Sequence, residues 1–433
     1  MKQKFNNLFN LNQYNTTVKG EILAGFTSFF AIVYIIAVNA SILSDAGLPL
    51  EGAIIATVLS SFVGCILVGF ISNAPLILVP GMGVNALFSY TIVGSMGLSW
   101  KQALAAVFIS GIIFSMIAFT KFSKTLTESI PICLKEAITV GIGILITFIG
   151  LQKSGIVMGS ETTFVTLGHF NNPLVYVTFI NLIITVVLFI RNVPGNFLIS
   201  MIIGTVISYF FGIVDISKLN FSSFSMAPYR DVFLKMDFSA VTSITFWVAI
   251  FSLTLVLVFE NLGLIHAHVN IMLNEPKKFK ASFKSCSLSA ITCGIFGTSP
   301  TVATIETAAG IAAGGKTGLT SIITGILFLV SLFLLPIIKI IPNSAISPIL
   351  IVIGGLMIKN ALNINFNDFS EGFPAFLIIV MIPLTFSIVD GMAFGFIAYP
   401  IVKIAEKKSK EISIAMYIIS IMFLLNFILH AIN

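Results

Sequence analysis

Long, uninterrupted apolar stretches are the feature that most constrains how this chain can fold. Stretches of about 20 apolar residues, the length that crosses a bilayer as a helix, recur between Glu21 and His430. Only 9% of the residues are charged, whereas a soluble domain carries roughly 25%. Because the stretches lack the period-two alternation of barrel strands, they predict an all-α polytopic membrane protein.

The apolar stretches also give the expected positions of the membrane spans. These are 21–43, 52–72, 101–120, 131–151, 173–190, 194–213, 243–265, 281–296, 318–338, 345–361, 373–388 and 390–405. A further apolar helix at 412–431 either spans the membrane or lies at its interface. Residues 1–20 lack the apolar core and cleavage site of a signal peptide, so we expect them to remain as a cytoplasmic N-terminal segment.

Two segments, 74–95 and 298–315, contain helix breakers inside apolar sequence. The first carries Pro80 within "LILVPGMG", and the second carries Pro300 within "TSPTVAT" and then Gly310. Proline and glycine at these places would interrupt a continuous helix. We therefore expect each segment to begin with a short extended piece and to continue as a short helix of small residues.

The two broken segments begin corresponding series of elements. In each, the breaker is followed by a short helix, a Gly-Leu turn and a long apolar helix. A second similarity links "IPICLKEAITVGIGILI" from Ile130 with "IPNSAISPILIVIGGLMI" from Ile341, at the same offset of about 210–220 residues. A duplication with seven segments per half inverts the second half, which predicts fourteen transmembrane segments as a 7+7 inverted repeat. Lysines and arginines in the loops expected on the cytoplasmic side support this topology.

The paired breaks mark the predicted binding site, because an interrupted helix exposes backbone groups that lipid cannot satisfy. Two acids belong to this region, Glu260 in "LVLVFENLGLIHA" and Glu306 in the second broken segment. Carboxylates inside a membrane are costly and usually face a cavity, so both are candidate substrate ligands and proton carriers. A carboxylate pairs well with the N–H edge of a flat, neutral base, whereas two carboxylates would repel sulfate or bicarbonate.

Several uncharged residues of these segments are further candidates for substrate contact. They are Asn85, Thr304, Thr307, Asn39, and Phe88 with a ring that can stack on a base. Each also has a structural interpretation as a helix cap, an interhelical hydrogen bond or core packing, and the sequence leaves both open.

Signatures of other functions are missing from the sequence. The four cysteines and four histidines show no metal-ligand spacing, and there is no nucleophile–base set or nucleotide-binding loop. We therefore predict no metal, no cofactor and no enzyme activity. The net charge of +6 is attributed to membrane topology rather than to nucleic-acid binding.

Four long motifs occur in order along nearly the whole chain: "TTVKGEILAGFTSFFAIVYIIAVNASILSDAGLP", "PGMGVNALFSY", "KEAITVGIGILITFIGLQKSGI" and "GTSPTVATIETAAGIAAGGKTGLTSIITGILF". They resemble signatures of the adenine/guanine/hypoxanthine permease branch of the nucleobase–cation symporter (nucleobase–ascorbate transporter) family. The resemblance implies that the base binds between short strands in the third and tenth segments. It also implies that Glu260 and Glu306 serve the substrate. The backbone around Ala303, Thr304 and Ile305, and that near Met82 to Val84, would complete the site.

The resemblance further implies a division of the chain into two bodies that move against each other. Residues 21–120 and 243–340 would form the two halves of a core domain, and residues 121–242 and 341–405 the two halves of a gate domain. Residues 406–433 would hold the C-terminal apolar helix.

Two departures from the family pattern lie in the predicted site. The eighth segment of this branch usually has an aspartate followed by Thr, an apolar residue, Gly and Thr, where this chain has "ENLGL" from Glu260 to Leu264. The usual threonine run of the tenth segment is "SPTVAT" here. These changes leave the preferred purine open.

The resulting prediction is a secondary active transporter that imports adenine, guanine or hypoxanthine by proton symport through alternating access. A uracil or xanthine carrier is one alternative, and an anion transporter of the same fold is another. Sodium stays open as the coupling ion. The expected partners are a purine nucleobase, the lipid bilayer and a second copy of the chain in a homodimer. The expected location is a bacterial-type inner cell membrane.

Overall fold

The computed structural model describes residues 8–120, 129–215 and 226–432. The first half contains helices α2 (Val18–Ile32), α3 (Ile35–Asp45), α4 (Leu50–Ser72), α5 (Met82–Ala86), α6 (Trp100–Phe119), α8 (Ile132–Lys153), α9 (Pro173–Ile190) and α10 (Asn196–Phe210). The second half contains α11 (Ile244–Ile265), α12 (Phe279–Phe296), α13 (Thr307–Ala312), α14 (Gly318–Val330), α15 (Leu335–Ile338), α16 (Asn343–Met357), α17 (Phe369–Thr385), α18 (Ile388–Ala405) and α19 (Ile414–Ile432).

Shorter elements complete the regular structure of these residues. The strands are β1 (Leu78–Pro80), β2 (Val157–Ser160), β3 (Phe164–Leu167) and β4 (Thr301–Ala303). π-helical turns continue α5 at Leu87–Ser95 and α11 at His266–Met272. Short 3-10 helices occur at Ala227–Asp231, Ser239–Thr242, Pro276–Lys278, Ser331–Leu334, Ile358–Asn363 and Ser409–Glu411.

The apolar stretches expected to cross the membrane are helical over most of their length. Nine helices of the described residues are long and apolar enough to do so, with α2 and α3 counted as one span. Helices α10 and α17 are apolar but shorter. Helix α12 carries several buried serines and packs between α4 and α6. The chain is therefore a helical multi-pass membrane protein, as its composition predicts.

The contact between α6 and α12 shows why small residues lie in these spans. A Cβ added to Gly111 of α6 would lie 2.7 Å from the backbone nitrogen of Ile291, and one added to Gly294 of α12 would lie 2.9 Å from the carbonyl oxygen of Leu104. The two helices thus meet backbone to backbone. Without a hydrophobic driving force between helices in lipid, such close packing is a main source of association.

The two broken segments meet inside the protein. Strands β1 and β4 pair antiparallel, with Leu78 opposite Ala303 and Pro80 opposite Thr301, and both strands are fully buried. Each strand leads into a short helix, α5 or α13. The Gly81 N–H donates to the carbonyl oxygen of Pro300 at 3.3 Å and so extends the pairing across both breakers. The predicted extended pieces and half-helices are confirmed.

Helix α14 is held by an acid from the opposite half of the chain. The carboxylate of Glu21 in α2 accepts hydrogen bonds from the backbone N–H groups of Lys316, Thr317 and Thr320, and from the Thr320 hydroxyl at 2.6 Å. Thr317 is the N-cap of α14 and Thr320 lies in its first turn, where unpaired N–H groups and the helix dipole favour a carboxylate. Glu21 is fully buried, and its role is structural capping.

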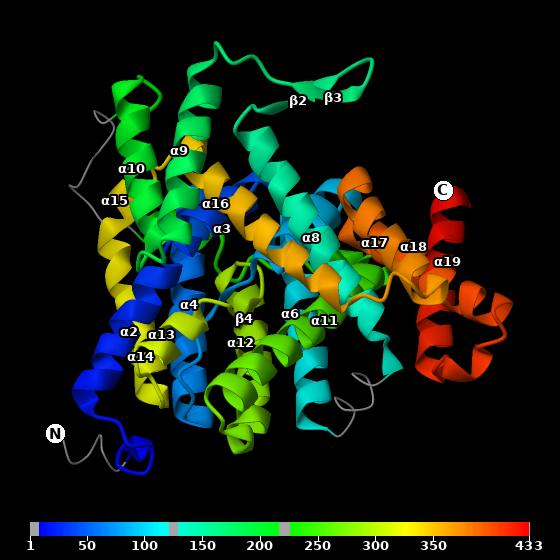
Figure 1. The fold of residues 1–433 in the computed structure, drawn as a ribbon, viewed down its shortest axis with the longest axis horizontal. Helices are drawn as coiled ribbons and strands as arrows, with labels where there is room; N and C mark the ends of the chain where they lie inside the picture. Colours follow the sequence, from blue (N-terminus) through cyan, green and yellow to red (C-terminus); the bar gives the residue numbers. More distant parts are fainter. Residues whose placement is uncertain (1–7, 121–128, 216–225, 433) are drawn as a thin grey trace.

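The helices divide into two sets by their packing. Helix α12 packs on α4 and α6, and α14 packs on α2 and α4. In the other set, α8 packs on α16 and α17, and α9 packs on α10 and α16. Figure 1 shows α8 and α16 crossing the centre of the view, with the β2–β3 hairpin at one end of the molecule and the start of α2 at the opposite end.

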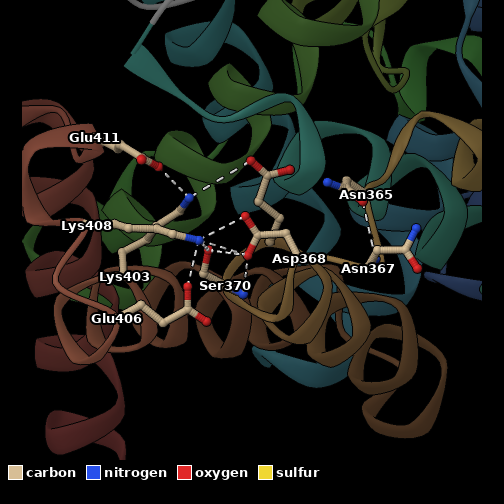
Figure 2. A network of polar contacts seen from close by, with 9 residues as sticks. Asn365, Asn367, Asp368, Ser370, Lys403, Glu406, Lys408 and Glu411 are labelled. Atoms are coloured by element: carbon tan, nitrogen blue, oxygen red, sulfur yellow. Dashed lines mark hydrogen bonds and ion pairs between the residues drawn. The ribbon is translucent and has the colours of Figure 1, made fainter.

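Charged side chains join the loops on either side of α17 and α18. Figure 2 shows Lys408 bound to Asp368 at 3.1 Å and to Glu406 at 2.7 Å. Lys403, which is almost fully buried, pairs with Glu411 at 2.6 Å. This network holds the loop before α17 against the loop that leads to α19.

Helix α19 presents two different faces. Phe423 is buried and packs against Phe251 of α11 and Phe396 of α18, with ring centroids 5.8 and 5.7 Å apart. Ile414 and Ile418 are exposed. The helix therefore lies at the edge of the molecule, with an apolar outer face (Figure 1).

Candidate functional site

A cavity of about 660 Å³ lies beside the paired strands. Its walls come from both sets of helices: α11, the strands β1 and β4, and the start of α3 on one side, and α8 and α16 on the other. Most of the lining side chains are apolar. Glu260 and Glu306, which the sequence singles out, both line it.

Glu306 lies directly ahead of α13, in the turn that follows β4. Its Oε1 atom accepts a hydrogen bond from the Tyr34 hydroxyl at 2.5 Å. Tyr34 occupies the break between α2 and α3, 272 residues away in the sequence. The carboxylate is partly buried and faces the cavity, so a ligand can reach it.

Glu260 approaches the first broken segment from α11. A Cβ added to Gly81 would lie 3.4 Å from its Oε1 atom, and one added to Gly83 would lie 4.0 Å from its Oε2 atom. The Glu260 carboxylate therefore lies beside these two glycines, at the start of α5. Each broken segment therefore has one acid next to it, and the two acids share one cavity.

Asn261, next to Glu260, anchors the second strand. Its Oδ1 atom accepts from the Ala303 N–H at 3.0 Å, and its amide nitrogen donates to the carbonyl oxygen of Leu257 at 2.9 Å. Ala303, Thr304 and Ile305 do line the cavity, as the resemblance implies. The N–H of Ala303, however, is already bonded inside the protein.

Four of the predicted contact residues lie away from the cavity lining. The side chains of Asn39 and Asn85 are fully buried and meet through Ser299, whose hydroxyl donates to Asn85 Oδ1 at 2.6 Å and to Asn39 Oδ1 at 3.2 Å. Asn39 also donates to Thr57 at 2.8 Å and to Thr298 at 3.1 Å. These bonds tie α3, α4 and both broken segments together.

The other two are Phe88 and Thr307. Phe88 is fully buried in the core, and Thr307 accepts a hydrogen bond from the Ile77 N–H at 3.1 Å. In this conformation both residues, like the two asparagines, serve packing or strand anchoring. A direct part in substrate binding stays a prediction for all four.

The structure adds polar residues at one end of the cavity. Lys135 and Glu136 lie near the start of α8, and Asn360 follows α16. The Lys135 ammonium lies 5.4 Å from the centre of the Phe259 ring, which also lines the cavity. The charged pair in "LKEAI" was a visible signal of this group, whereas nothing in the sequence points to Tyr34.

At the opposite end of α8, an ion pair connects this helix to α3. Lys153 binds Asp45 at 2.7 Å and donates to the Ser41 hydroxyl at 3.0 Å, which joins α8 to α3. Tyr90 donates to the same aspartate at 2.5 Å. This ion pair therefore connects α8 to α3 at the end of α8 opposite to Lys135 and Glu136.

The described residues show no cluster of three or more His, Cys, Asp or Glu side chains that could hold a metal ion. What they do show is a partly polar cavity inside a helical membrane protein, built where two broken segments from repeated halves meet. This arrangement defines the class of multi-pass membrane transporters. The comparisons with known proteins agree. The chain matches the Permease family over residues 19–394, and it belongs to that family.

Relatives support this membership over almost the full length. The chain is 49% identical to the nucleobase transporter PlAzg2 of Paenibacillus larvae, in a match covering 88% of this chain and 76% of that protein. It is 38% identical to the guanine/hypoxanthine permease PbuO of Bacillus subtilis, over 96% of this chain and 98% of that protein. Family membership places the chain among permeases rather than enzymes.

The fold also resembles solved transporter structures at low sequence identity. The transmembrane domain of a cyanobacterial bicarbonate transporter, BicA, aligns with a TM-score of 0.66 at 16% identity, over 86% of this chain and 96% of that domain. SLC26A9 aligns with a TM-score of 0.70 at 14% identity, over 92% of this chain and 66% of that one. These likenesses confirm the predicted 7+7 fold and carry no information on the substrate.

Proposed function

We propose that this permease imports a purine nucleobase, namely adenine, guanine or hypoxanthine, by proton symport. The observation that carries the proposal is the pair of carboxylates, Glu260 and Glu306, in one cavity beside the paired strands. Relatives of 49% and 38% identity are named as a nucleobase transporter and a guanine/hypoxanthine permease. The site chemistry and the relatives thus favour the same substrate class.

Glu306 is the proposed ligand for N–H groups of the base. Charge-assisted hydrogen bonds to a carboxylate are roughly twice as strong as neutral ones. The surrounding walls are apolar, which suits the faces of a flat aromatic ring. Glu260, beside the glycines of the first broken segment, is the second proposed ligand or the carrier of the coupling proton.

The anion alternative fits this cavity poorly, even though BicA shares the fold. Two carboxylates lining one cavity would repel bicarbonate or sulfate, and Coulomb repulsion is stronger in a partly dry site than in water. A uracil or xanthine carrier remains the alternative within nucleobase transport, because the same carboxylates would accept the N–H groups of those bases.

Alternating access is proposed because the cavity lies between the two expected bodies, with α11, β1 and β4 on one side and α8 and α16 on the other. The core domain, residues 21–120 and 243–340, would move against the gate domain, residues 121–242 and 341–405. The Asp45–Lys153 pair links the two and closes one side. The N-terminus would lie in the cytoplasm of a bacterial-type cell. A homodimer in the inner membrane completes the proposal.

The test is competition binding to purified protein with adenine, guanine, hypoxanthine, xanthine and uracil. We expect at least one purine to bind, and Glu306→Gln to weaken it by about 100-fold because a charged acceptor is lost. Glu161→Gln, an exposed acid in the β2–β3 hairpin, is the matched control and should bind as wild type does. Failure of every base to bind, or wild-type binding by Glu306→Gln, would contradict the proposal.

Coupling needs a separate measurement. Uptake of the bound purine into proteoliposomes should follow an imposed proton gradient and stop when a protonophore collapses it. Uptake that follows a sodium gradient instead would make sodium the coupling ion. Labelled bicarbonate uptake in the same vesicles tests the anion alternative.

A further inference from the structure

A second, smaller cavity lies between the two sets of helices. Its volume is about 200 Å³, and its walls come from α3, the start of α4, the end of α8, the end of α15 and the start of α16. The polar side chains in these walls are Ser41, Ser44, Asp45, Lys153, Lys339 and Asn343. The small cavity is therefore a place where a polar ligand can find hydrogen-bond partners.

Three helices line both this small cavity and the main cavity beside the paired strands. The residues involved, with the main-cavity residue first, are Ile35 and Ser44 in α3, Ile142 and Lys153 in α8, and Ile353 and Ile346 in α16. At about 1.5 Å per residue, α3 rises about 13 Å from Ile35 to Ser44, nearly half of the hydrocarbon core of a bilayer. The two cavities therefore follow one another along the same helices.

Buried apolar side chains occupy the helix positions between the two cavities. They are Ile146 and Ile149 in α8, and Ile349 and Leu350 in α16, each at most 2% exposed. A polar ligand does not cross such a layer while it is packed, because its polar groups would lose water without gaining a partner. In this conformation the layer keeps the small cavity apart from the main one.

Two ion pairs hold the helices around the small cavity. Lys153 of α8 binds Asp45 of α3 at 2.7 Å, and Lys339, which follows α15, pairs with Glu51 of α4. The Asp45 and Glu51 side chains are 35% and 33% exposed. Exposed ion pairs contribute only about 0–1 kcal/mol each. Both pairs can therefore break at a small cost in free energy when the two sets of helices move.

We propose that the small cavity is part of the transport path, and that the nucleobase passes through it between the main cavity and the side of the membrane nearest the end of α8. The inference rests on the proposed function and adds a second place where the base is held. Once Lys153 and Asp45 separate, the carboxylate accepts N–H groups of the base. The Ser41 and Ser44 hydroxyls and the Lys153 ammonium can donate to its ring nitrogens or to a carbonyl oxygen.

The test uses Ser44→Cys, because Ser44 is half-buried in the wall of the small cavity and lies outside the lining of the main one. The purified variant is modified in detergent with methyl or benzyl methanethiosulfonate, and is then reconstituted for uptake of a labelled purine. We expect the benzyl adduct to lower uptake about tenfold or more and the methyl adduct to lower it less than about threefold, because only the larger adduct fills the cavity. Reduction with dithiothreitol should restore uptake.

Purine binding separates a blocked path from a damaged site. The benzyl adduct should leave the dissociation constant of the purine within about threefold of that of the unmodified variant, because Glu260 and Glu306 line the other cavity. The matched control is Ser409→Cys, which is exposed in the 3-10 helix before α19 and lies outside both linings. It should transport at its unmodified rate after either reagent. The four native cysteines are buried and contribute little to the modification.

Three results would overturn the inference. Unchanged uptake with the benzyl adduct would place the small cavity outside the path. An equal loss with both adducts would show that Ser44 matters for packing rather than for passage. Loss of purine binding with the benzyl adduct would show that the modification acts on the main site. Failure of the proposed function has a different signature, namely that wild type and the unmodified variant neither bind nor transport a purine.

Discussion

The two broken segments occupy equivalent places in the repeat but hold different side chains. The segment with β1 and α5 carries Asn85, whose side chain is fully buried and bonded to Ser299 of the other segment. The segment with β4 and α13 carries Glu306, whose carboxylate faces the cavity. Both strands are needed for the paired backbone, whereas only one segment supplies an acid of its own. The two segments therefore share their backbone geometry and differ in the polar side chains that they carry.

The first broken segment has no acid of its own, and its neighbouring acid comes from helix α11. The Glu260 carboxylate of α11 lies beside Gly81 and Gly83 of this segment, and a Cβ at Gly81 would collide with a Val302 methyl group at 2.5 Å. The site thus has one acid within a broken segment and one brought to a broken segment by a neighbouring helix. Five variants test this difference, in order of decreasing effect on purine binding.

Gly81→Val should have the largest effect. Even a Cβ at this position would lie 2.5 Å from a Val302 methyl group and 3.4 Å from the Glu260 carboxylate, so the strand pair must shift. We expect purine binding to be lost and stability to fall by about 1–3 kcal/mol from overpacking. Binding titration and thermal unfolding of the purified protein measure both. Wild-type affinity in this variant would show that the first segment does not shape the site.

Asn261→Ala should have the second-largest effect on purine binding. The variant leaves the buried Ala303 N–H without its acceptor, at a cost of about 1–3 kcal/mol. Because β4 leads directly to Glu306, we expect purine affinity to drop about tenfold along with stability. Titration together with urea unfolding checks this. If stability falls and affinity does not, Asn261 holds the strand without positioning the acid.

Asn85→Ala should reduce stability without a comparable loss of purine affinity. It removes the acceptor of the Ser299 hydroxyl, which retains its longer bond to Asn39, so we expect a loss of about 1–2 kcal/mol in stability. Purine affinity should stay within about threefold of wild type, as expected of a residue outside the cavity lining. A loss comparable to that of Glu306→Gln would make Asn85 a substrate contact after all.

Lys153→Gln should change how often the protein opens toward the end of α8, with little effect on its affinity for a purine. It breaks the ion pair with Asp45, so molecules open toward the end of α8 should become about fivefold more frequent. Labelling of Ser44→Cys, which lines the small cavity at this end, reports the opening. The four native cysteines are buried and give little background. Lys408→Gln, which breaks the pairs with Asp368 and Glu406 and lies outside the lining of this small cavity, is the control and should label at the unmodified rate.

Asp368→Asn should leave purine binding unchanged, because this residue belongs to the network in Figure 2 and lies outside the cavity lining. Hydrogen bonds from Ser370 and Lys408 lower the pKa of Asp368 to about 2 from its ordinary value of 3.8. A depressed acid pKa stabilises the folded state above about pH 4, and this contribution is lost as the pH falls toward 2. The wild type should therefore lose its small advantage over the variant in that window, as thermal unfolding at pH 7, 4 and 3 would show.

The sequence by itself determined the membrane spans, the two broken segments and the acids Glu260 and Glu306. These features are local: apolar length sets a span, proline and glycine interrupt a helix, and a carboxylate inside the membrane marks a cavity. The duplication was also readable, because it repeats a pattern at a fixed offset.

Only the tertiary structure decided which polar groups meet. Tyr34 reaches Glu306, Asn261 holds the Ala303 N–H, and Ser299 binds Asn85 and Asn39, all across long sequence separations. A buried polar group must find a partner, but composition and spacing do not say which one. The candidate ligands were therefore predictable as residue types in broken helices, whereas their division into cavity lining and scaffold follows from how the two halves pack.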